Sequence, residues 1–202
     1  MGSQAVTLYV VATPVGNLSD ITLRALDTLK NVDIIACEDT RVSSVLCEKY
    51  GISTKLVSYH KFSENARTEL FLGYLKEGKS VALVSDAGTP LISDPGAKLV
   101  EAVRKEGYNV VPIVGASAIT ALLSAIPRES EDFKFVGFLP RSEKQLEDTL
   151  KANRSENLVF YESPNRLIAS LNMLKGRKIA VGRELTKKFE EIIVDYAENI
   201  AE

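Results

Sequence analysis

The sequence predicts an α/β protein of two domains, with a mostly parallel sheet in the first domain and a mixed sheet in the second. The prediction rests on short β-branched and aliphatic runs that alternate with segments of helical periodicity, joined by short connections. The length of 202 residues suits one large domain or two small ones. With 45% hydrophobic and 26% charged residues, the composition excludes collagen-like, low-complexity and disordered chains. We place the domains at residues 1–114 and 115–202.

In the first half, each expected strand is a short apolar run, and a helical segment follows each of the first four. The strands are expected at residues 7–12, 32–36, 55–58, 80–84 and 109–113. The helices are expected at residues 22–30, 40–50, 63–77 and from 94–96 to about 106. Ser19 or Asp20 is expected to cap the first helix and Asp94 the last, while Gly51 and Gly78 end the two helices between them.

The second half has a similar organisation with less regular spacing. Strands are expected at residues 134–137, 157–161, 178–182 and 190–196. Helices are expected at residues 117–125, 142–153 and from 163–164 to 175. Ser142 and Gln145 form a capping box at the start of the second of these helices.

The scarce residues exclude several classes of site. No stretch approaches the roughly 20 apolar residues of a membrane helix. The start, residues 1–5, lacks the features of a secretory signal. The chain has one histidine and two cysteines, which argues against a zinc site and against a disulfide framework. So few cysteines favour a reduced, cytoplasmic chain. Cys37 is expected to be a core residue rather than a nucleophile.

Charge is spread evenly along the chain. Residues 1–112 carry 12 Lys and Arg against 13 Asp and Glu, and residues 113–202 carry 13 against 14. Each half therefore has a net charge of −1, and neither has a basic arm. A nucleic-acid substrate would have to be contacted by a local patch of cations.

Three loops rich in small residues follow predicted strands, at residues 13–20, 85–96 and 114–118. Ligands of parallel sheets bind beyond the carboxyl ends of the strands, so these loops are expected to form a ligand cleft; tight packing of the loops is the alternative. The chain has neither a dinucleotide fingerprint nor a phosphate-binding loop. Because loop 85–96 carries Asp86 and Asp94 but no Lys or Arg, we expect a cationic or neutral small molecule rather than a polyphosphate.

Polar runs also follow strands. After the second strand, Asp39 is either a base or a helix cap, and Arg41 is either a substrate contact or an ion-pair partner of the acids beside it. His60, in the run 58–61, is either a base or a structural histidine. Arg183 and Lys187 are spaced four apart and lie on one side if a helical turn follows the strand; a solvated turn is the alternative.

Together these runs resemble a family of bacterial ribosomal RNA ribose methyltransferases of the tetrapyrrole methylase superfamily, which modify the 2′-hydroxyl of a decoding-centre cytidine. The resemblance covers about residues 7–196 and is carried by the runs 8–18, 38–41, 58–60, 84–96, 161–166 and 183–187. The chain departs from the family at Val42, where His is usual, and at residues 114–118, where Pro-Gly-Pro-Ser-Ala is usual. Many members also continue into a further C-terminal segment.

The resemblance implies S-adenosylmethionine, held between two α/β domains of a homodimer, and 16S ribosomal RNA within the small ribosomal subunit as substrate; no metal is implied. With the loops above, it assigns a set of cofactor-binding residues. These are Pro14, Gly16, Ser85, Asp86, Ala87, Gly88, Thr89, Pro90, Gly115, Ser117 and Ala118. The candidates for the base that accepts the hydroxyl proton are Glu38, Asp39 and His60. Lys187 is a less favoured candidate, because it would need a lowered pKa to act as a base. Residues that position RNA are expected to be Arg41, Arg166, Arg183 and Lys187.

Three other functions remain open at this point. A related enzyme could methylate a small molecule such as a tetrapyrrole, for which a large apolar pocket would be the sign. A cofactor-binding module without catalysis would bind the cofactor and transfer no methyl group. A hydrolase would have to be built around His60, the single histidine.

Overall fold

The computed structural model describes residues 6–60, 64–128 and 130–201. The expectations that concern residues 1–5 and the residues at 61 and 63 lie outside this range. The chain divides into two compact units, residues up to Ala118 and residues from Ile119. Residues 115–118 therefore group with the first unit, whereas the sequence placed them in the second domain. They do so because Gly115 packs closely on Ala12, and the carbonyl of Ala116 accepts a hydrogen bond from Thr89.

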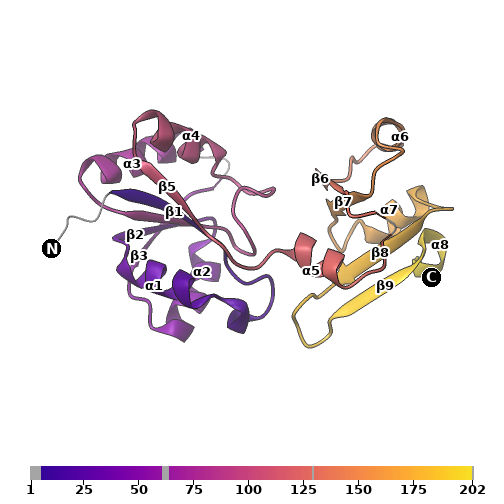
Figure 1. Ribbon diagram of the computed structural model, residues 1–202, viewed down its shortest axis with the longest axis horizontal. Helices are drawn as coiled ribbons and strands as arrows, with labels where there is room; N and C mark the ends of the chain where they lie inside the picture. Colours follow the sequence, from indigo (N-terminus) through magenta and orange to yellow (C-terminus); the bar gives the residue numbers. More distant parts are fainter. Residues whose placement is uncertain (1–5, 61–63, 129, 202) are drawn as a thin grey trace. The chain divides into compact units, whose positions relative to one another are not determined.

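A parallel sheet of five strands forms the centre of the first unit (Figure 1). Its strands are β1 Thr7–Val11, β2 Ile34–Cys37, β3 Lys55–Ser58, β4 Val81–Val84 and β5 Asn109–Ile113. Their order across the sheet is β3-β2-β4-β1-β5, and every neighbouring pair is parallel. The mostly parallel sheet predicted from the sequence is confirmed, and all five strands have their carboxyl ends at one edge.

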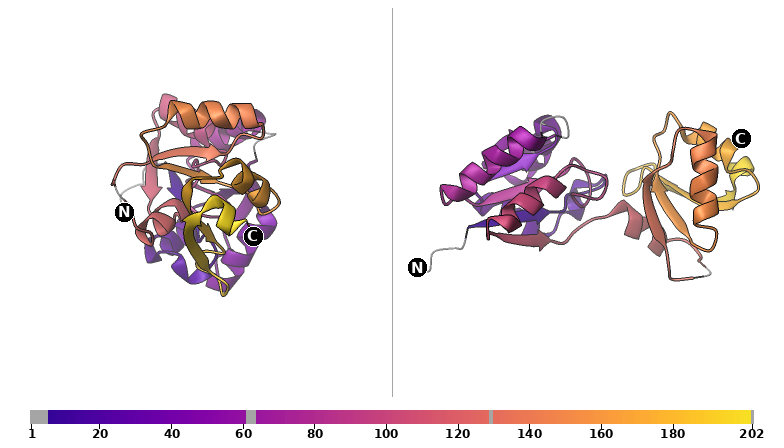
Figure 2. Two further views of the ribbon diagram at one scale, coloured as in Figure 1. Left: turned by 90° about the vertical axis from the view of Figure 1, so that its right-hand side faces the viewer. Right: turned by 90° about the horizontal axis from the view of Figure 1, so that it is seen from above.

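Helices cover both faces of this sheet. They are α1 Leu23–Asn31, α2 Thr40–Tyr50, α3 Glu64–Lys76 and α4 Ala97–Lys105, preceded by the short 3-10 helix η1 Leu18–Asp20. Helices α1 and α2 lie on one face and α3 and α4 on the other, and the right-hand view of Figure 2 looks onto the second. Successive residues of β2 alternate between the two cores, with Ile35 packed beside α1 and α2 and Ile34 beside α3 and α4.

Two helix caps differ from the sequence prediction. Helix α1 is capped by Thr22, whose hydroxyl accepts from the amide of Ala25, because Asp20 belongs to η1 instead. Helix α4 is entered at Gly96, which has no side chain, so Asp94 does not cap it. The expected end of α2 at Gly51 is confirmed, with a left-handed φ of 62°.

The second unit contains two small sheets where the sequence predicted one mixed sheet. Strands β6 Lys134–Phe138 and β7 Leu158–Tyr161 are parallel, while β8 Lys178–Arg183 and β9 Glu191–Tyr196 form an antiparallel hairpin. The register of β6 on β7 shifts between Phe135 and Phe138, around Gly137 with its φ of +72°, which interrupts the ladder. The two strand pairs are not joined by ladder hydrogen bonds, so they remain separate sheets.

The described residues of this half of the chain form four helices. They are α5 Ala118–Ser124, α6 Glu143–Ala152, α7 Leu167–Met173 and α8 Ala197–Ile200. The hydroxyl of Ser142 accepts from the amide of Gln145 at 3.3 Å, so the predicted cap of α6 is confirmed. Within the described residues, no helix has the length and apolar character needed to cross a membrane.

Candidate active site

The three loops rich in small residues meet at the carboxyl edge of the parallel sheet. Thr13 and Gly88 exchange backbone hydrogen bonds of 2.8 and 3.0 Å, and the Thr13 hydroxyl donates to the carbonyl of Ser85 at 3.1 Å. The Thr89 hydroxyl donates to the carbonyl of Ala116 at 3.0 Å. These bonds connect loops that follow β1, β4 and β5, so the structure brings together the loops that the sequence singled out.

Two glycines allow the close approach of these loops. Gly88 has a φ of +79°, and a Cβ atom there would lie 3.4 Å from Cγ1 of Val15. A Cβ atom on Gly115 would lie 2.9 Å from the Cβ of Ala12. Further along loop 85–96, Leu91 and Ser93 adopt left-handed φ values of 71° and 80°, which side chains other than glycine rarely adopt. Such strain is tolerated where surrounding contacts enforce it, and it often marks functional sites.

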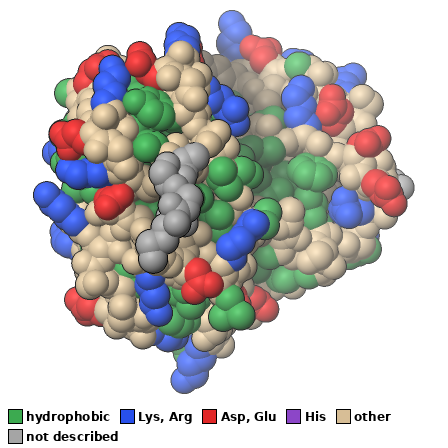
Figure 3. All heavy atoms as spheres, turned by 60° about the vertical axis from the view of Figure 1, so that its left-hand side comes forward, with side chains coloured by type: hydrophobic (Ala, Val, Ile, Leu, Met, Phe, Trp, Pro, Cys, Tyr) green, Lys and Arg blue, Asp and Glu red, His purple; other side chains and the backbone are tan. Residues whose placement is uncertain are grey.

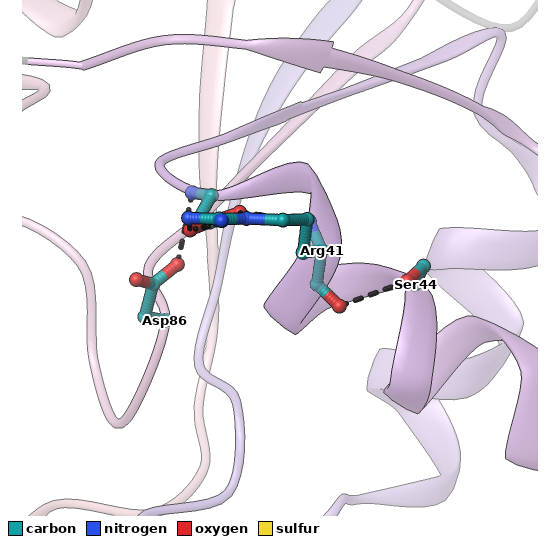
Figure 4. A network of polar contacts seen from close by, with 4 residues as sticks. Arg41, Ser44 and Asp86 are labelled. Carbon is teal, nitrogen blue, oxygen red and sulfur yellow. Dashed lines mark hydrogen bonds and ion pairs between the residues drawn. The ribbon is translucent and has the colours of Figure 1, made fainter.

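The polar run after β2 lies beside loop 85–96. A carboxylate oxygen of Asp86 accepts from the backbone amide of Asp39 at 3.0 Å, and Figure 4 shows Asp86 reaching towards the start of α2, where Arg41 lies. Asp39 caps α2 by accepting from the amide of Arg41 at 2.8 Å, and it pairs with the guanidinium of Arg41 at 2.5 Å. The Arg41 guanidinium holds the pKa of Asp39 at about 2. Asp39 is therefore both a cap and an ion-pair partner, and its carboxylate is a weaker base than that of Glu38, whose pKa is raised.

Three further carboxyl groups influence one another at this edge. Partial burial raises the pKa of Glu38, and the nearby Asp86 and Asp94 raise that pKa further, while His60 lowers it. Partial burial also raises the pKa values of Asp86 and Asp94. The cluster therefore disfavours additional negative charge and suits a cationic group. Among the described residues, no group of three His, Cys, Asp or Glu side chains is placed to hold a metal ion.

Cys37, at the end of β2, is a core residue as expected. Its side chain is fully buried, and burial raises the pKa of its thiol to about 11. A thiol with so high a pKa is a poor nucleophile at neutral pH.

Asp86→Asn should stabilise the first unit at neutral pH. The pKa of Asp86 is higher in the folded protein than in the unfolded chain, so the folded state disfavours the ionised carboxylate. Its contribution to stability is full below the unfolded pKa and is lost as the pH rises through the folded pKa. Asparagine keeps an oxygen that can accept from the Asp39 amide but carries no charge. We expect a higher melting temperature at pH 7.5, and a difference from wild type that narrows as the pH falls through the folded pKa of Asp86. Thermal unfolding across the acidic and neutral pH range measures it.

Asp33→Asn is the matched control, because Asp33 also accepts a backbone hydrogen bond, from Ser80 at 2.8 Å, at the start of β2. Because Asp33 lies at the other end of β2 from the carboxyl groups of Glu38, Asp86 and Asp94, its replacement should not raise the melting temperature at pH 7.5. A lower melting temperature of Asp86→Asn at pH 7.5 would contradict the prediction.

In the second unit, Arg166 is engaged in contacts within its own unit. Its guanidinium donates to the carbonyls of Leu139 at 3.0 Å and Pro140 at 3.2 Å, and it pairs with Glu162 at 3.3 Å. The Glu162 side chain is only 6% exposed and also accepts from the Ser170 hydroxyl at 2.6 Å. Arg166 therefore ties the loop after β6 to the turn after β7.

Arg183 and Lys187 lie at the turn between β8 and β9, and the helical turn considered for them does not form. Arg183 pairs with Glu191 across the hairpin, and Lys187 pairs with Glu184 at 3.1 Å. The turn contains two residues other than glycine with positive φ, Glu184 at 51° and Thr186 at 67°.

Two residues that sequence reasoning did not single out lie beside these candidate site residues. Phe189 is 71% exposed in the β8–β9 turn, with the ammonium of Lys188 5.4 Å from its ring centre. An aromatic residue inside a polar turn was the signal that could have found it. Glu64, at the start of α3, accepts a hydrogen bond from the amide of Gly96 at the end of loop 85–96, and nothing local in the sequence indicates that contact.

Comparison with known proteins adds the family. Residues 7–201 match the family described as Tetrapyrrole (Corrin/Porphyrin) Methylases. The chain belongs to the tetrapyrrole methylase family. The fold class and the resemblance to tetrapyrrole methylases drawn from the motifs are thereby confirmed.

Curated proteins named Ribosomal RNA small subunit methyltransferase I are similar to this member of the tetrapyrrole methylase family. The protein from Bacillus subtilis is 49% identical over 92% of this chain and 66% of its own length. Those from Mesorhizobium japonicum and Escherichia coli O157:H7 are 50% and 46% identical over 92% of this chain, and over 65% and 67% of their own lengths. The chain thus spans about two thirds of the length of these relatives.

Several solved structures have the same fold at low sequence identity. A diphthine synthase superposes with a TM-score of 0.75 at 19% identity, covering 98% of this chain and 84% of its own. A cobalt precorrin-4 methyltransferase superposes with a TM-score of 0.71 at 16% identity, covering 96% of this chain and 87% of its own. At such identities the likeness establishes the fold.

Proposed function

We propose that the chain is an S-adenosylmethionine-dependent methyltransferase that modifies the ribose 2′-hydroxyl of a cytidine in 16S ribosomal RNA. The observation that carries the proposal is the 46–50% identity, over 92% of the chain, to three proteins named Ribosomal RNA small subunit methyltransferase I. In the first unit, the motifs that carry the resemblance lie at the carboxyl edge of the sheet, which is where parallel α/β sheets bind ligands.

The residues at this edge fit the cofactor. S-Adenosylmethionine supplies a methyl group on a positively charged sulfur, and the acidic cluster of Glu38, Asp86 and Asp94 offers negative charge that suits a cation. Backbone groups of the loops 13–17, 85–90 and 115–118 would hold the cofactor, since their small residues leave the main chain accessible. We assign to it Pro14, Gly16, Ser85, Asp86, Ala87, Gly88, Thr89, Pro90, Gly115, Ser117 and Ala118.

Glu38 is our choice for the base that accepts the ribose proton, with His60 as the other candidate. A carboxyl group with a raised pKa binds a proton more readily at neutral pH than Asp39, whose pKa is about 2. Glu38 would take the proton as the ribose oxygen forms its bond to the methyl carbon and the bond from that carbon to sulfur breaks. Because the methyl group is already activated, the chain's main contribution is to position the two reactants.

The RNA would be contacted by local cations rather than by bulk charge. Figure 3 shows cationic and anionic side chains interspersed on the face that it draws, in keeping with the net charge of −1 on each half of the sequence. Arg41, Arg183 and Lys187 are exposed, and Arg183 and Lys187 share their turn with the exposed ring of Phe189. An aromatic ring beside cations can stack on an unpaired base while the cations contact phosphates.

The deciding experiment measures transfer of labelled methyl groups to small ribosomal subunits from cells that lack the modification, followed by mapping of the modified ribose. Since the chain gains little from counterion release, transfer to subunits should exceed transfer to naked 16S RNA at matched salt. Methylation of a tetrapyrrole instead of RNA, or cofactor binding with no methyl transfer at all, would overturn the proposal.

The resemblance also leads us to propose a cytoplasmic homodimer, which size-exclusion chromatography with light scattering can test.

Arg183→Ala should weaken RNA binding without changing the affinity for S-adenosylmethionine. Loss of one phosphate contact should flatten the dependence of log affinity on log salt by about one unit. The matched control is Arg177→Ala, because Arg177 is an exposed arginine that immediately precedes β8, at the opposite end of the same strand. If Arg183→Ala loses cofactor affinity while RNA affinity stays intact, Arg183 belongs to the cofactor site.

A further inference from the structure

The carboxylate of Glu64 receives donors from two separate segments of the first unit. Glu64 is the first residue of α3, and its side chain is only 14% exposed. One oxygen accepts from the backbone amide of Gly96 at 3.1 Å and from the hydroxyl of Tyr59 at 3.3 Å. The other oxygen lies 3.9 Å from the ammonium of Lys98 on α4. A single side chain thus connects the end of β3, the start of α3 and the start of α4.

The contact with Gly96 takes the place of a helix cap. Helix α4 has no side-chain cap of its own, because its first flanking residue is Gly96. A Cβ atom at that position would lie 2.7 Å from Cδ2 of Leu83, and the φ of +136° also disfavours other residues. The cap is therefore supplied by Glu64 from another helix, and its negative charge suits the positive end of α4.

The contact with Tyr59 reaches the residue next to His60. Tyr59 is fully buried, its ring packs edge-on against Phe71 at 5.7 Å, and its hydroxyl also lies 3.1 Å from the hydroxyl of Thr68. Burial raises the pKa of Tyr59 to about 12, so the hydroxyl keeps its proton and can donate to Glu64 at neutral pH.

Loop 85–96 is held at its two ends by different contacts. Thr13 and the carbonyl of Ala116 hold its first half, through the bonds to Ser85, Gly88 and Thr89. Glu64 holds its last residue, two positions after Asp94, whose carboxyl group also contacts the side chain of Ser85. Loss of Glu64 should therefore loosen the end of the loop and leave Asp94 held by Ser85 alone, while the half assigned to the cofactor stays fixed.

We propose that Glu64 is a positioning residue for methyl transfer, which fixes Asp94 and the end of loop 85–96 relative to His60. This proposal rests on the proposed function, in which the loop and the residues beside it surround the reactants. It assigns to Glu64 no contact with substrate or cofactor; its effect acts through the two segments that it connects.

The first test needs no activity. Hydrogen–deuterium exchange of the segment 91–96 should be at least about tenfold faster in Glu64→Ala, since the Gly96 amide loses a charged acceptor. Glu64→Gln keeps an oxygen that can accept from both donors, so its exchange should stay within about threefold of wild type. Unchanged exchange in Glu64→Ala, or equal acceleration in both variants, overturns the proposal.

The second test separates binding from turnover. In Glu64→Ala, kcat should fall at least about tenfold while the Kd for S-adenosylmethionine changes less than about threefold, and Glu64→Gln should recover most of kcat. Glu69→Ala is the control, because Glu69 is an exposed glutamate on the same helix. Faster exchange with an unchanged kcat would overturn a positioning role.

Tyr59→Phe provides a second variant if Glu64→Ala does not fold. It removes only the hydroxyl and keeps the buried ring, so kcat should fall severalfold with the cofactor Kd unchanged; an unchanged kcat contradicts the role. Wild-type chain that binds cofactor but methylates no RNA would overturn the proposed function, whereas the exchange experiment would still decide whether Glu64 holds the loop.

Discussion

Gly88→Val should lower the affinity for S-adenosylmethionine by at least about tenfold, which corresponds to about 1.4 kcal/mol. Gly88 adopts a φ of +79°, which a β-branched residue rarely tolerates, and its backbone exchanges two hydrogen bonds with Thr13. The branched side chain would also contact Val15 and extend into the space beside the three loops. Isothermal titration calorimetry with the folded variant measures the loss.

Gly78→Val is the control that separates this local effect from general strain. Gly78 has nearly the same φ, +81°, at the turn after α3, and nothing lies within 4 Å of the position of its Cβ atom. The control should lose a comparable amount of stability and keep its cofactor affinity. Equal affinities of Gly88→Val and wild type would show that this loop does not hold the cofactor.

Glu38→Gln should reduce the rate of methyl transfer by about 10²–10⁴-fold while the cofactor Kd stays within a small factor of wild type. Glutamine cannot accept the ribose proton at neutral pH. Since a base must be ionised, the wild-type rate should rise with pH through the pKa of Glu38, which burial raises above its ordinary value. Single-turnover rates across the pH range measure both effects.

Two comparisons decide which group is the base. Glu48→Gln is the control, because Glu48 is an exposed glutamate on α2. This substitution should leave the rate of methyl transfer and its pH dependence unchanged. If His60→Ala removes the rising limb of the pH profile while Glu38→Gln retains it, the histidine is the base and our choice is wrong.

Much of the first unit could be predicted from the sequence, because its signals are local. The residues 40–50 were predicted as a helix and form α2 over the same span, since Asp39 provides the cap and Gly51 the left-handed stop. The apolar runs 55–58 and 109–113 likewise form β3 and β5. The meeting of the three loops followed from the parallel order of the strands alone.

The features that were missed depend on partners distant in sequence. The cap of α4 comes from Glu64, 32 residues before Gly96. Local sequence indicated Asp94 as the cap instead, and that prediction is wrong. Separation of the second-unit strands into two pairs depends on the shifted register around Gly137, which no periodicity reveals. Arg41 and Asp39 could be placed beside each other from sequence, whereas the bond from the Asp39 amide to Asp86 could not.

The strand order of the first unit has a consequence for synthesis on the ribosome. Strand β1 emerges first, yet its two neighbours are β4 and β5, which are translated more than 60 residues later. Strands β2 and β3 can pair sooner, but they touch β1 only through β4. The nascent chain must therefore carry the apolar side chains of β1, including Leu8 and Val11, unpaired until β4 has left the exit tunnel. During that interval the emerging chain should be a good client for chaperones that bind hydrophobic segments.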